Sequence, residues 1–192
     1  MIDSLVHAWP RIEPMEHWKS FGLERGSYGL VTLHRPSNVD RFESLRAPIA
    51  SLQQNAERLP LGVPVHPRTR ARLEAAGLEA RGGLHVIEPL GYLEFLSLLS
   101  GARIMLTDSG GIQEETTFLR VPCLTLRDNT ERPITMTHGT NTLVGSQPRN
   151  LADIAFSRIA GGNGPQNLPP LWDGRAAERI ARILGELLLS DS

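Results

Sequence analysis

The sequence contains one cysteine, Cys123, and one lysine, Lys19, among its 192 residues. A single cysteine cannot form an internal disulfide, so a reducing compartment is expected, and the apolar neighbours of Cys123 predict an inert thiol in a buried strand. No apolar run approaches the roughly 18 residues that a membrane-spanning helix needs. No basic stretch followed by an apolar one marks a signal peptide. We therefore expect a cytoplasmic protein without a membrane partner.

An excess of charge of one sign is also missing. The 20 lysines and arginines nearly balance the 21 aspartates and glutamates, which leaves a formal net charge of -1. This balance gives no basic footprint for nucleic acid. The six histidines show no metal-ligand spacing, and neither a Walker A loop nor a Gly-x-Gly-x-x-Gly fingerprint follows a strand. We expect no nucleic-acid partner, no metal and no cofactor.

Short apolar runs alternate with helical periods along most of the chain. The strands are expected at residues 28–33, 63–66, 84–87, 103–107, 121–126 and 142–144. Helices are expected at residues 42–59, 68–76, 91–100, 110–119 and 151–160. Such alternation implies crossover connections and a parallel sheet. The predicted fold class is therefore α/β, a Rossmann-like doubly wound parallel sheet, which binds ligands beyond the carboxyl ends of its strands.

Three regions are expected along the chain. Residues 1–27 form an N-terminal segment with a short helix at 2–9, which Pro10 and Pro14 interrupt. Residues 28–172 form the Rossmann-like domain. Residues 173–192 form a C-terminal helix with one apolar face and one charged face.

A glycine-rich turn at residues 107–111 joins an expected strand to an expected helix. The unpartnered backbone N–H groups and the dipole of a helix start form an anion site that suits a phosphate. Ser109 adds a hydroxyl, and Gly110 and Gly111 let a phosphate approach the backbone. Glu115, one turn further, is placed to accept hydrogen bonds from two ribose hydroxyls. An ordinary capped helix with an acidic residue near its start is the alternative interpretation.

Two more polar segments follow expected strands. His34 and Arg35 leave the end of the first strand, where a histidine can donate to a diphosphate or move a proton near neutral pH. Arg127 and Arg132 flank an acidic loop after the strand at 121–126, which suits recognition of phosphate or carboxylate. A surface His-Arg pair and a salt-bridged loop are the alternatives. All these segments fall on one edge of the predicted sheet.

Together these segments resemble the non-hydrolysing UDP-N-acetylglucosamine 2-epimerases. The resemblance rests on residues 32–40, 107–115, 130–133, 139–141 and 144–145, whose order and spacing match the second half of that family. The run Asp-Ser-Gly-Gly-Ile-Gln-Glu-Glu within it is highly specific. The resemblance implies the C-terminal half of a GT-B architecture, in which two Rossmann-like domains enclose a UDP-sugar.

The resemblance also implies roles for single residues. It implies one catalytic residue, His34, and six residues that bind the UDP-sugar: Phe95, Ser109, Gly110, Gly111, Glu115 and Arg132. In this arrangement the diphosphate lies on the glycine-rich turn, the ribose on Glu115 and the uracil against residues 90–95. His34 and Arg132 lie near the diphosphate or the sugar.

The family reaction interconverts UDP-GlcNAc and UDP-ManNAc by eliminating and re-adding UDP. The resemblance assigns the acid/base carboxylates to a first domain that this chain lacks, and it implies that the final helix packs across the domain junction. We therefore expect an inactive isolated chain that binds a UDP-sugar, with an N-terminal-half chain or a second copy as partner. A fragment of a GT-B UDP-dependent glycosyltransferase, a hydrolysing epimerase and a non-catalytic UDP-sugar-binding module remain open alternatives.

Overall fold

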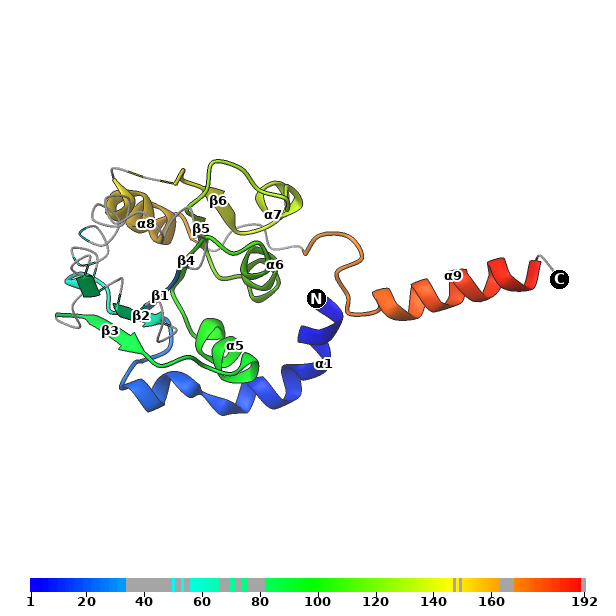
Figure 1. Ribbon diagram of the computed structural model, residues 1–192, viewed down its shortest axis with the longest axis horizontal. Coiled ribbons are helices and arrows are strands. Elements are labelled where there is room, and N and C mark those ends of the chain that lie inside the picture. Colours follow the sequence, from blue (N-terminus) through cyan, green and yellow to red (C-terminus); the bar gives the residue numbers. More distant parts are fainter. Residues whose placement is uncertain are drawn as a thin grey trace.

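Figure 1 shows the protein as a computed structural model. The structure describes residues 1–33, 50, 53, 56–65, 70–71, 74–75, 82–146, 148, 150–162 and 168–190. His34 lies outside the described residues, as do most residues of the helices expected at 42–59 and 68–76.

A parallel sheet forms the centre of the described structure. Its strands are β1 (Gly29–Thr32), β2 (Leu61–Pro64), β3 (Leu84–Ile87), β4 (Ile104–Thr107), β5 (Cys123–Thr125) and β6 (Asn141–Leu143). They are ordered β3-β2-β1-β4-β5-β6, and every neighbouring pair is parallel. The order runs outward from β1 in both directions, which is the doubly wound arrangement that the sequence predicts. All six predicted strands are confirmed, with no end shifted by more than two residues.

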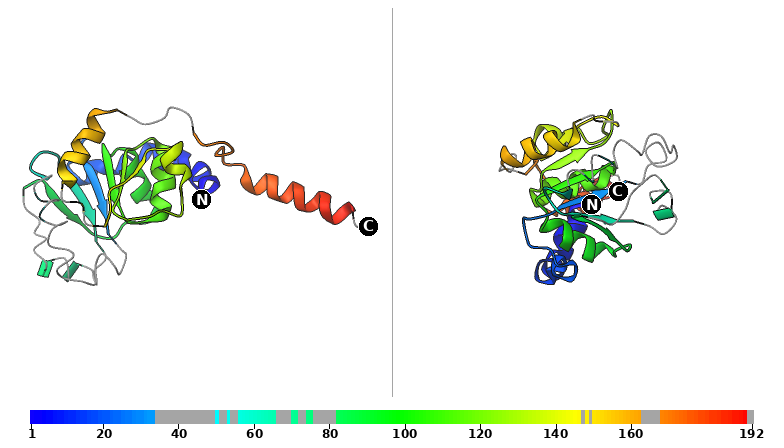
Figure 2. Two further views of the ribbon diagram at one scale, coloured as in Figure 1. Left: turned by 90° about the horizontal axis from the view of Figure 1, so that it is seen from above. Right: turned by 90° about the vertical axis from the view of Figure 1, so that its left-hand side faces the viewer.

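Helices cover both faces of this sheet (Figure 2). The described helices are α1 (Ile2–Ile12), α5 (Tyr92–Ser100), α6 (Gly110–Leu119), α7 (Ile134–Thr137), α8 (Leu151–Ala160) and α9 (Ala176–Ser190). Two 3₁₀ turns, η1 (Glu13–Met15) and η2 (His17–Phe21), follow α1. The helices predicted at 91–100, 110–119 and 151–160 are confirmed within one residue.

Alternate strand residues pack into two separate cores. On one face Leu30, Met105 and Cys123 meet α1, α5 and α6. On the other face Val31 and Leu124 meet α8. Because both faces are buried, the strands are apolar at consecutive positions, as expected for a covered parallel sheet.

The first helix is longer than predicted. It continues through Pro10 to Ile12 instead of stopping at Trp9. Proline removes one backbone donor, but Leu5 and Ile12 lie two turns apart on one face and are both fully buried. The apolar contacts with α5 therefore outweigh the missing hydrogen bond.

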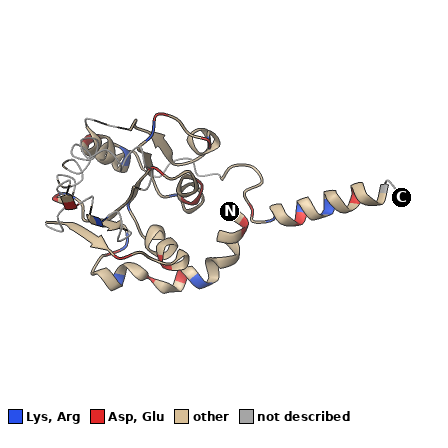
Figure 3. Cartoon of the chain, viewed as in Figure 1, with Lys and Arg blue, Asp and Glu red and all other residues tan. Residues whose placement is uncertain are grey.

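The last helix, α9, extends away from the rest of the molecule (Figure 1). Its apolar side chains stay in solvent, since Ile180, Ile183 and Leu184 are each at least half exposed. Figure 3 shows positive and negative residues interspersed, without a broad region of one sign in the part of the chain that is described. No described helix is both long and apolar enough to cross a membrane.

Two glycines at the same place in their helices provide a stability test. Gly101 ends α5 and Gly161 ends α8, both in right-handed helical conformation. A Cβ on Gly101 would lie 2.6 Å from the Trp18 ring and 2.7 Å from the Tyr28 hydroxyl, whereas a Cβ on Gly161 would make only ordinary contacts. Gly101→Ala is therefore expected to lower the free energy of unfolding by about 1–3 kcal/mol through overpacking.

In the same denaturant titration, Gly161→Ala is expected to raise the free energy of unfolding by up to about 1 kcal/mol, because alanine restricts the unfolded chain. Equal effects of the two substitutions would contradict the packing described around Trp18.

Candidate functional site

A cavity of about 450 Å³ opens at the carboxyl ends of the central strands. It is lined by Thr32, Pro64, Pro89, Leu90, Phe95, Ser109, Gly111, Ile112 and Glu115. These residues come from four elements, β1, β2, α5 and α6, from the segment after β3, and from the turn before α6. Four of the predicted binding residues, Phe95, Ser109, Gly111 and Glu115, therefore meet at one cavity. Gly110 lies beside it as the first residue of α6.

The turn between β4 and α6 is held by two threonines from neighbouring strands. Ser109 has an extended backbone and precedes the first helical residue, Gly110. Its N–H donates to Thr107 Oγ1 at 3.0 Å, and Thr107 Oγ1 lies 2.7 Å from Thr32 Oγ1. The Ser109 side chain makes no capping hydrogen bond to α6. The start of the helix thus presents its first N–H groups and a serine hydroxyl beside the cavity, as an anion site requires.

Glu115 is a buried carboxyl group of α6 that also lines the cavity. It is 6% exposed, and it accepts a hydrogen bond from the Tyr92 hydroxyl at the start of α5. Burial raises the pKa of Glu115 to about 7, although the Tyr92 hydrogen bond opposes that rise. A buried carboxylate has few water molecules to donate hydrogen bonds to it. Hydroxyl groups of a ligand can supply those hydrogen bonds instead.

The two arginines that flank the loop after β5, Arg127 and Arg132, have different surroundings. The Arg127 side chain is 7% exposed and donates to Glu131 Oε1 at 2.8 Å. The Arg132 side chain is 41% exposed, and its Nε lies 3.1 Å from Glu114 Oε1, an ion pair without hydrogen-bond geometry. Arg127 fits the salt-bridged alternative, because it is enclosed within its own loop. Arg132 is the more accessible of the two, although it does not line the cavity.

Sequence reasoning missed the contact between Tyr92 and Glu115. Tyr92 begins the helix after β3, a position where side chains often meet ligands in this fold class. Only the packing of α5 beside α6 shows that its hydroxyl reaches the carboxyl group of Glu115. The predicted catalytic residue, His34, lies outside the described residues.

The thiol of Cys123 has the buried position that the sequence predicts. It is fully buried in β5, and burial raises its pKa to about 11. A thiol with such a pKa stays protonated and is a poor nucleophile. Within the described ranges, no group of three or more histidine, cysteine, aspartate or glutamate residues could hold a metal ion.

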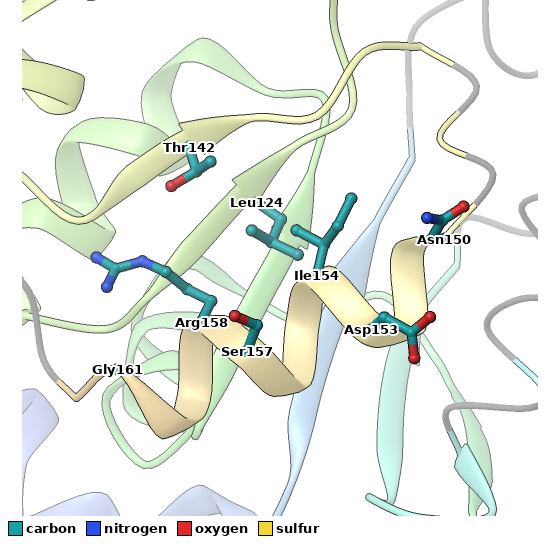
Figure 4. A pocket seen from close by; sticks show the side chains of 8 residues that line it. All are labelled: Leu124, Thr142, Asn150, Asp153, Ile154, Ser157, Arg158 and Gly161. Atoms are coloured by element: carbon teal, nitrogen blue, oxygen red, sulfur yellow. The ribbon is translucent and has the colours of Figure 1, made fainter.

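A second cavity, of about 460 Å³, lies between α8 and the β5–β6 side of the sheet (Figure 4). It is lined by Leu124, Thr142, Asn150, Asp153, Ile154, Ser157, Arg158 and Gly161. Arg158 extends toward β6 and donates to the carbonyl oxygens of Gly162 and Thr140 at 3.3 and 3.5 Å. None of the sequence-predicted site residues lines this cavity, so it is separate from the candidate site.

The sequence matches one family over nearly its full length. A family model described as UDP-N-acetylglucosamine 2-epimerase matches residues 1–185. The UDP-N-acetylglucosamine 2-epimerase of Methanocaldococcus jannaschii is 42% identical over 163 residues, which cover 82% of this chain and 44% of the relative. The UDP-2,3-diacetamido-2,3-dideoxy-D-glucuronate 2-epimerase of Pseudomonas aeruginosa is 40% identical, with the same two coverages. The chain thus spans less than half the length of these relatives.

The fold is also similar to that of solved proteins. The crystal structure of the M. jannaschii UDP-GlcNAc 2-epimerase in complex with UDP-GlcNAc and UDP superposes with a TM-score of 0.81 at 37% identity. The superposition covers 96% of this chain and 52% of that one. Together with the parallel sheet, this match confirms the α/β class and the expected half of a GT-B architecture.

Glu115 provides a test of the site by pH. Its pKa in the folded state lies above the ordinary value of 4.5, so between about pH 4.5 and 7 the folded protein binds more protons than the unfolded protein. Wild-type stability should therefore fall through this window relative to Glu115→Gln, which cannot ionise. We expect the free energy of unfolding of Glu115→Gln to gain on the wild type by up to about 3 kcal/mol between pH 5 and pH 8.

Denaturant titrations at the two pH values measure this gain, and a constant difference would contradict it. Tyr92→Phe is the matched variant, and its stability is expected to change with pH in the opposite direction from that of Glu115→Gln when each is compared with the wild type. It removes the hydrogen bond that favours the ionised carboxylate, so the loss of stability between pH 5 and pH 8 should exceed that of the wild type.

Proposed function

The chain belongs to the UDP-N-acetylglucosamine 2-epimerase family, and from this premise we propose that its cavity binds the UDP part of a UDP-sugar. The observation that carries the proposal is the meeting of two complementary groups at one cavity. The start of α6 offers N–H donors for a diphosphate, and the buried carboxyl group of Glu115 offers acceptors for ribose hydroxyls. A nucleoside diphosphate needs both.

Each part of UDP has a matching part of the cavity. The diphosphate lies on the N–H groups of the turn and on the Ser109 hydroxyl, with Gly110 and Gly111 allowing close approach. The ribose 2′ and 3′ hydroxyls donate to Glu115. The uracil lies against Leu90 and Phe95, the apolar lining residues on the α5 side of the cavity. Arg132, the accessible arginine after β5, lies close enough to α6 to pair with Glu114 and supplies positive charge for the diphosphate or the sugar.

UDP is also the part of the substrate that the relatives share. Both relatives named above are 2-epimerases whose names begin with UDP, but their sugars differ. The proposed reaction of the whole enzyme is the interconversion of UDP-GlcNAc and UDP-ManNAc by elimination and re-addition of UDP, which belongs to cell-envelope polysaccharide biosynthesis. In that reaction this chain holds the leaving group, and His34 is the proposed catalytic residue.

These 192 residues are proposed to be inactive by themselves. Inversion at C2 needs proton-transfer groups on both faces of the sugar. Glu115 is the one titratable residue among the described residues that line the cavity. In the proposed complex its carboxylate binds the ribose hydroxyls, so it is not available for proton transfer at the sugar. The remaining groups are proposed to come from a partner domain, because the chain covers only about half of its relatives.

The C-terminal helix provides the surface for that partner. Ile180, Ile183 and Leu184 are between 50 and 57% exposed along α9. An apolar helix face of this kind is stable in a soluble protein when another surface covers it. The start of α9 is held on the body, since Ala177 N–H donates to Asp3 Oδ2 at 2.8 Å. We infer that the apolar face of α9 packs on an N-terminal-half domain, and that a second copy of the chain takes this place when that domain is absent.

Titration calorimetry with UDP tests the nucleotide site. Wild-type protein is expected to bind UDP, and Glu115→Ala is expected to weaken binding about ten- to a hundredfold, as loss of hydrogen bonds to a charged group does. Glu178→Ala removes an exposed carboxylate on α9 and should leave the affinity unchanged. Absence of UDP binding by the wild type would remove the basis of the proposal.

A product assay tests the incompleteness. Purified chain incubated with UDP-GlcNAc is expected to give no UDP-ManNAc. Turnover should appear when the N-terminal half of the M. jannaschii relative is added as a separate polypeptide, and Leu184→Glu on α9 should reduce it at least about tenfold by burying an unpaired charge. Turnover by the chain alone would contradict the proposed division of the enzyme.

A further inference from the structure

We propose that Gln113 and Thr130 are positioning residues that hold the Arg132 segment at a fixed place relative to the start of α6. This inference rests on the proposed function, since it concerns two elements that contact the same nucleotide. Neither Gln113 nor Thr130 lines the cavity among the described residues. Their role would be to set the distance between two groups that do contact ligand.

Gln113 is the centre of a buried hydrogen-bond network. Its side chain is fully buried in the first turn of α6. Its Nε2 donates to the carbonyl oxygen of Ser109 at 3.2 Å, the residue that precedes the helix. Its Oε1 accepts from Thr130 Oγ1 at 2.6 Å and from Asn141 Nδ2 at 3.0 Å. One side-chain amide thus connects the anion-binding turn with the loop after β5.

The backbone of Arg132 is held from both sides by this network. Its N–H donates to Thr130 Oγ1 at 2.9 Å. Its carbonyl oxygen accepts from Thr135 Oγ1 at 2.7 Å, and Thr135 Oγ1 in turn accepts from Asn141 Nδ2 at 3.2 Å. Asn141 is itself fixed to the sheet, because its Oδ1 accepts from Thr125 Oγ1 at 2.5 Å. Side-chain hydrogen bonds therefore link the Arg132 backbone to α6 and to β5.

The arrangement fixes the backbone of Arg132 but leaves its side chain accessible. The side chain is 41% exposed, and its contact with α6 is the Glu114 ion pair at 3.1 Å. In the proposed complex, UDP therefore pairs with an arginine outside the cavity lining whose backbone is already fixed relative to α6. Holding a charged group in place before binding lowers the entropy that binding must remove.

The network also explains why polar side chains, and not apolar ones, are buried between α6 and the loop after β5. Gln113, Thr125, Thr135 and Asn141 are all at most 5% exposed. Burial of these amides and hydroxyls is costly unless each finds a partner. A purely structural role predicts that removal of one member harms stability alone. A positioning role predicts that it also harms UDP binding, and only while Arg132 is present.

Thr130 carries the test, because substitution of the fully buried Gln113 risks unfolding the chain. Thr130→Val keeps the shape and removes the hydroxyl that bridges Gln113 and Arg132, whereas Thr130→Ser retains the hydroxyl. Thr137→Val, the same change at an exposed threonine of α7, is the control. UDP affinity is measured by calorimetry for each variant, in the wild-type background and in the Arg132→Ala background, after thermal unfolding has shown that each variant is folded.

Thr130→Val is expected to weaken UDP binding about three- to tenfold in the wild-type background, which corresponds to one hydrogen bond, and to have no effect in the Arg132→Ala background. Thr130→Ser and Thr137→Val are expected to bind like the wild type. Equal losses in both backgrounds, or no loss in either, would overturn the inference.

A second measurement does not depend on UDP. Amide hydrogen exchange at Arg132 and Thr135 should be at least about tenfold faster in Thr130→Val than in the wild type, and unchanged in Thr130→Ser. Failure of the wild type to bind UDP would count against the proposed function alone, and exchange would then decide whether Thr130 holds the segment. Unchanged exchange in Thr130→Val would overturn the positioning role whatever the UDP result.

Discussion

Burial of both faces of the parallel sheet is the constraint on which the rest of the structure depends. Side chains along the strands must be apolar or fully hydrogen-bonded, so accessible polar chemistry is left to the strand ends. The cavity lies at those ends and draws its lining from four elements that are distant in sequence. Thr32 and Thr107 lie where the buried strands β1 and β4 meet the cavity. Both hydroxyls are buried, and that of Thr107 accepts a hydrogen bond from the turn before α6.

The polar groups of this region have different energetic roles. Glu115 is a buried carboxyl group whose ionisation the protein opposes. That opposition costs stability at neutral pH, and a ligand that donates hydroxyls to the carboxylate would recover part of it. The network around Gln113 is the reverse case, since its members satisfy one another within the protein. The first group is suited to binding and the second to holding the binding groups in place.

The proposed function requires both a grip on UDP and proton transfer at the sugar. In the proposal, the start of α6, Glu115 and the apolar side of α5 bind UDP. The described residues also include α9, which extends away from the sheet (Figure 1) and whose side chains Ile180, Ile183 and Leu184 are each at least half exposed. The proposal of a partner domain rests on this exposed helix face and on the match to about half of the related structure.

The sequence by itself determined the order of the elements and one side of the site. Apolar runs predicted the six strands, and the glycine-rich turn with Glu115 predicted residues that line the cavity, because both signals are local in the chain. Only the tertiary structure placed Tyr92 on Glu115, separated Arg127 from Arg132, and carried α1 through Pro10. Those features depend on contacts between elements that are far apart in sequence, and the energies of such contacts leave no local pattern for the sequence to show.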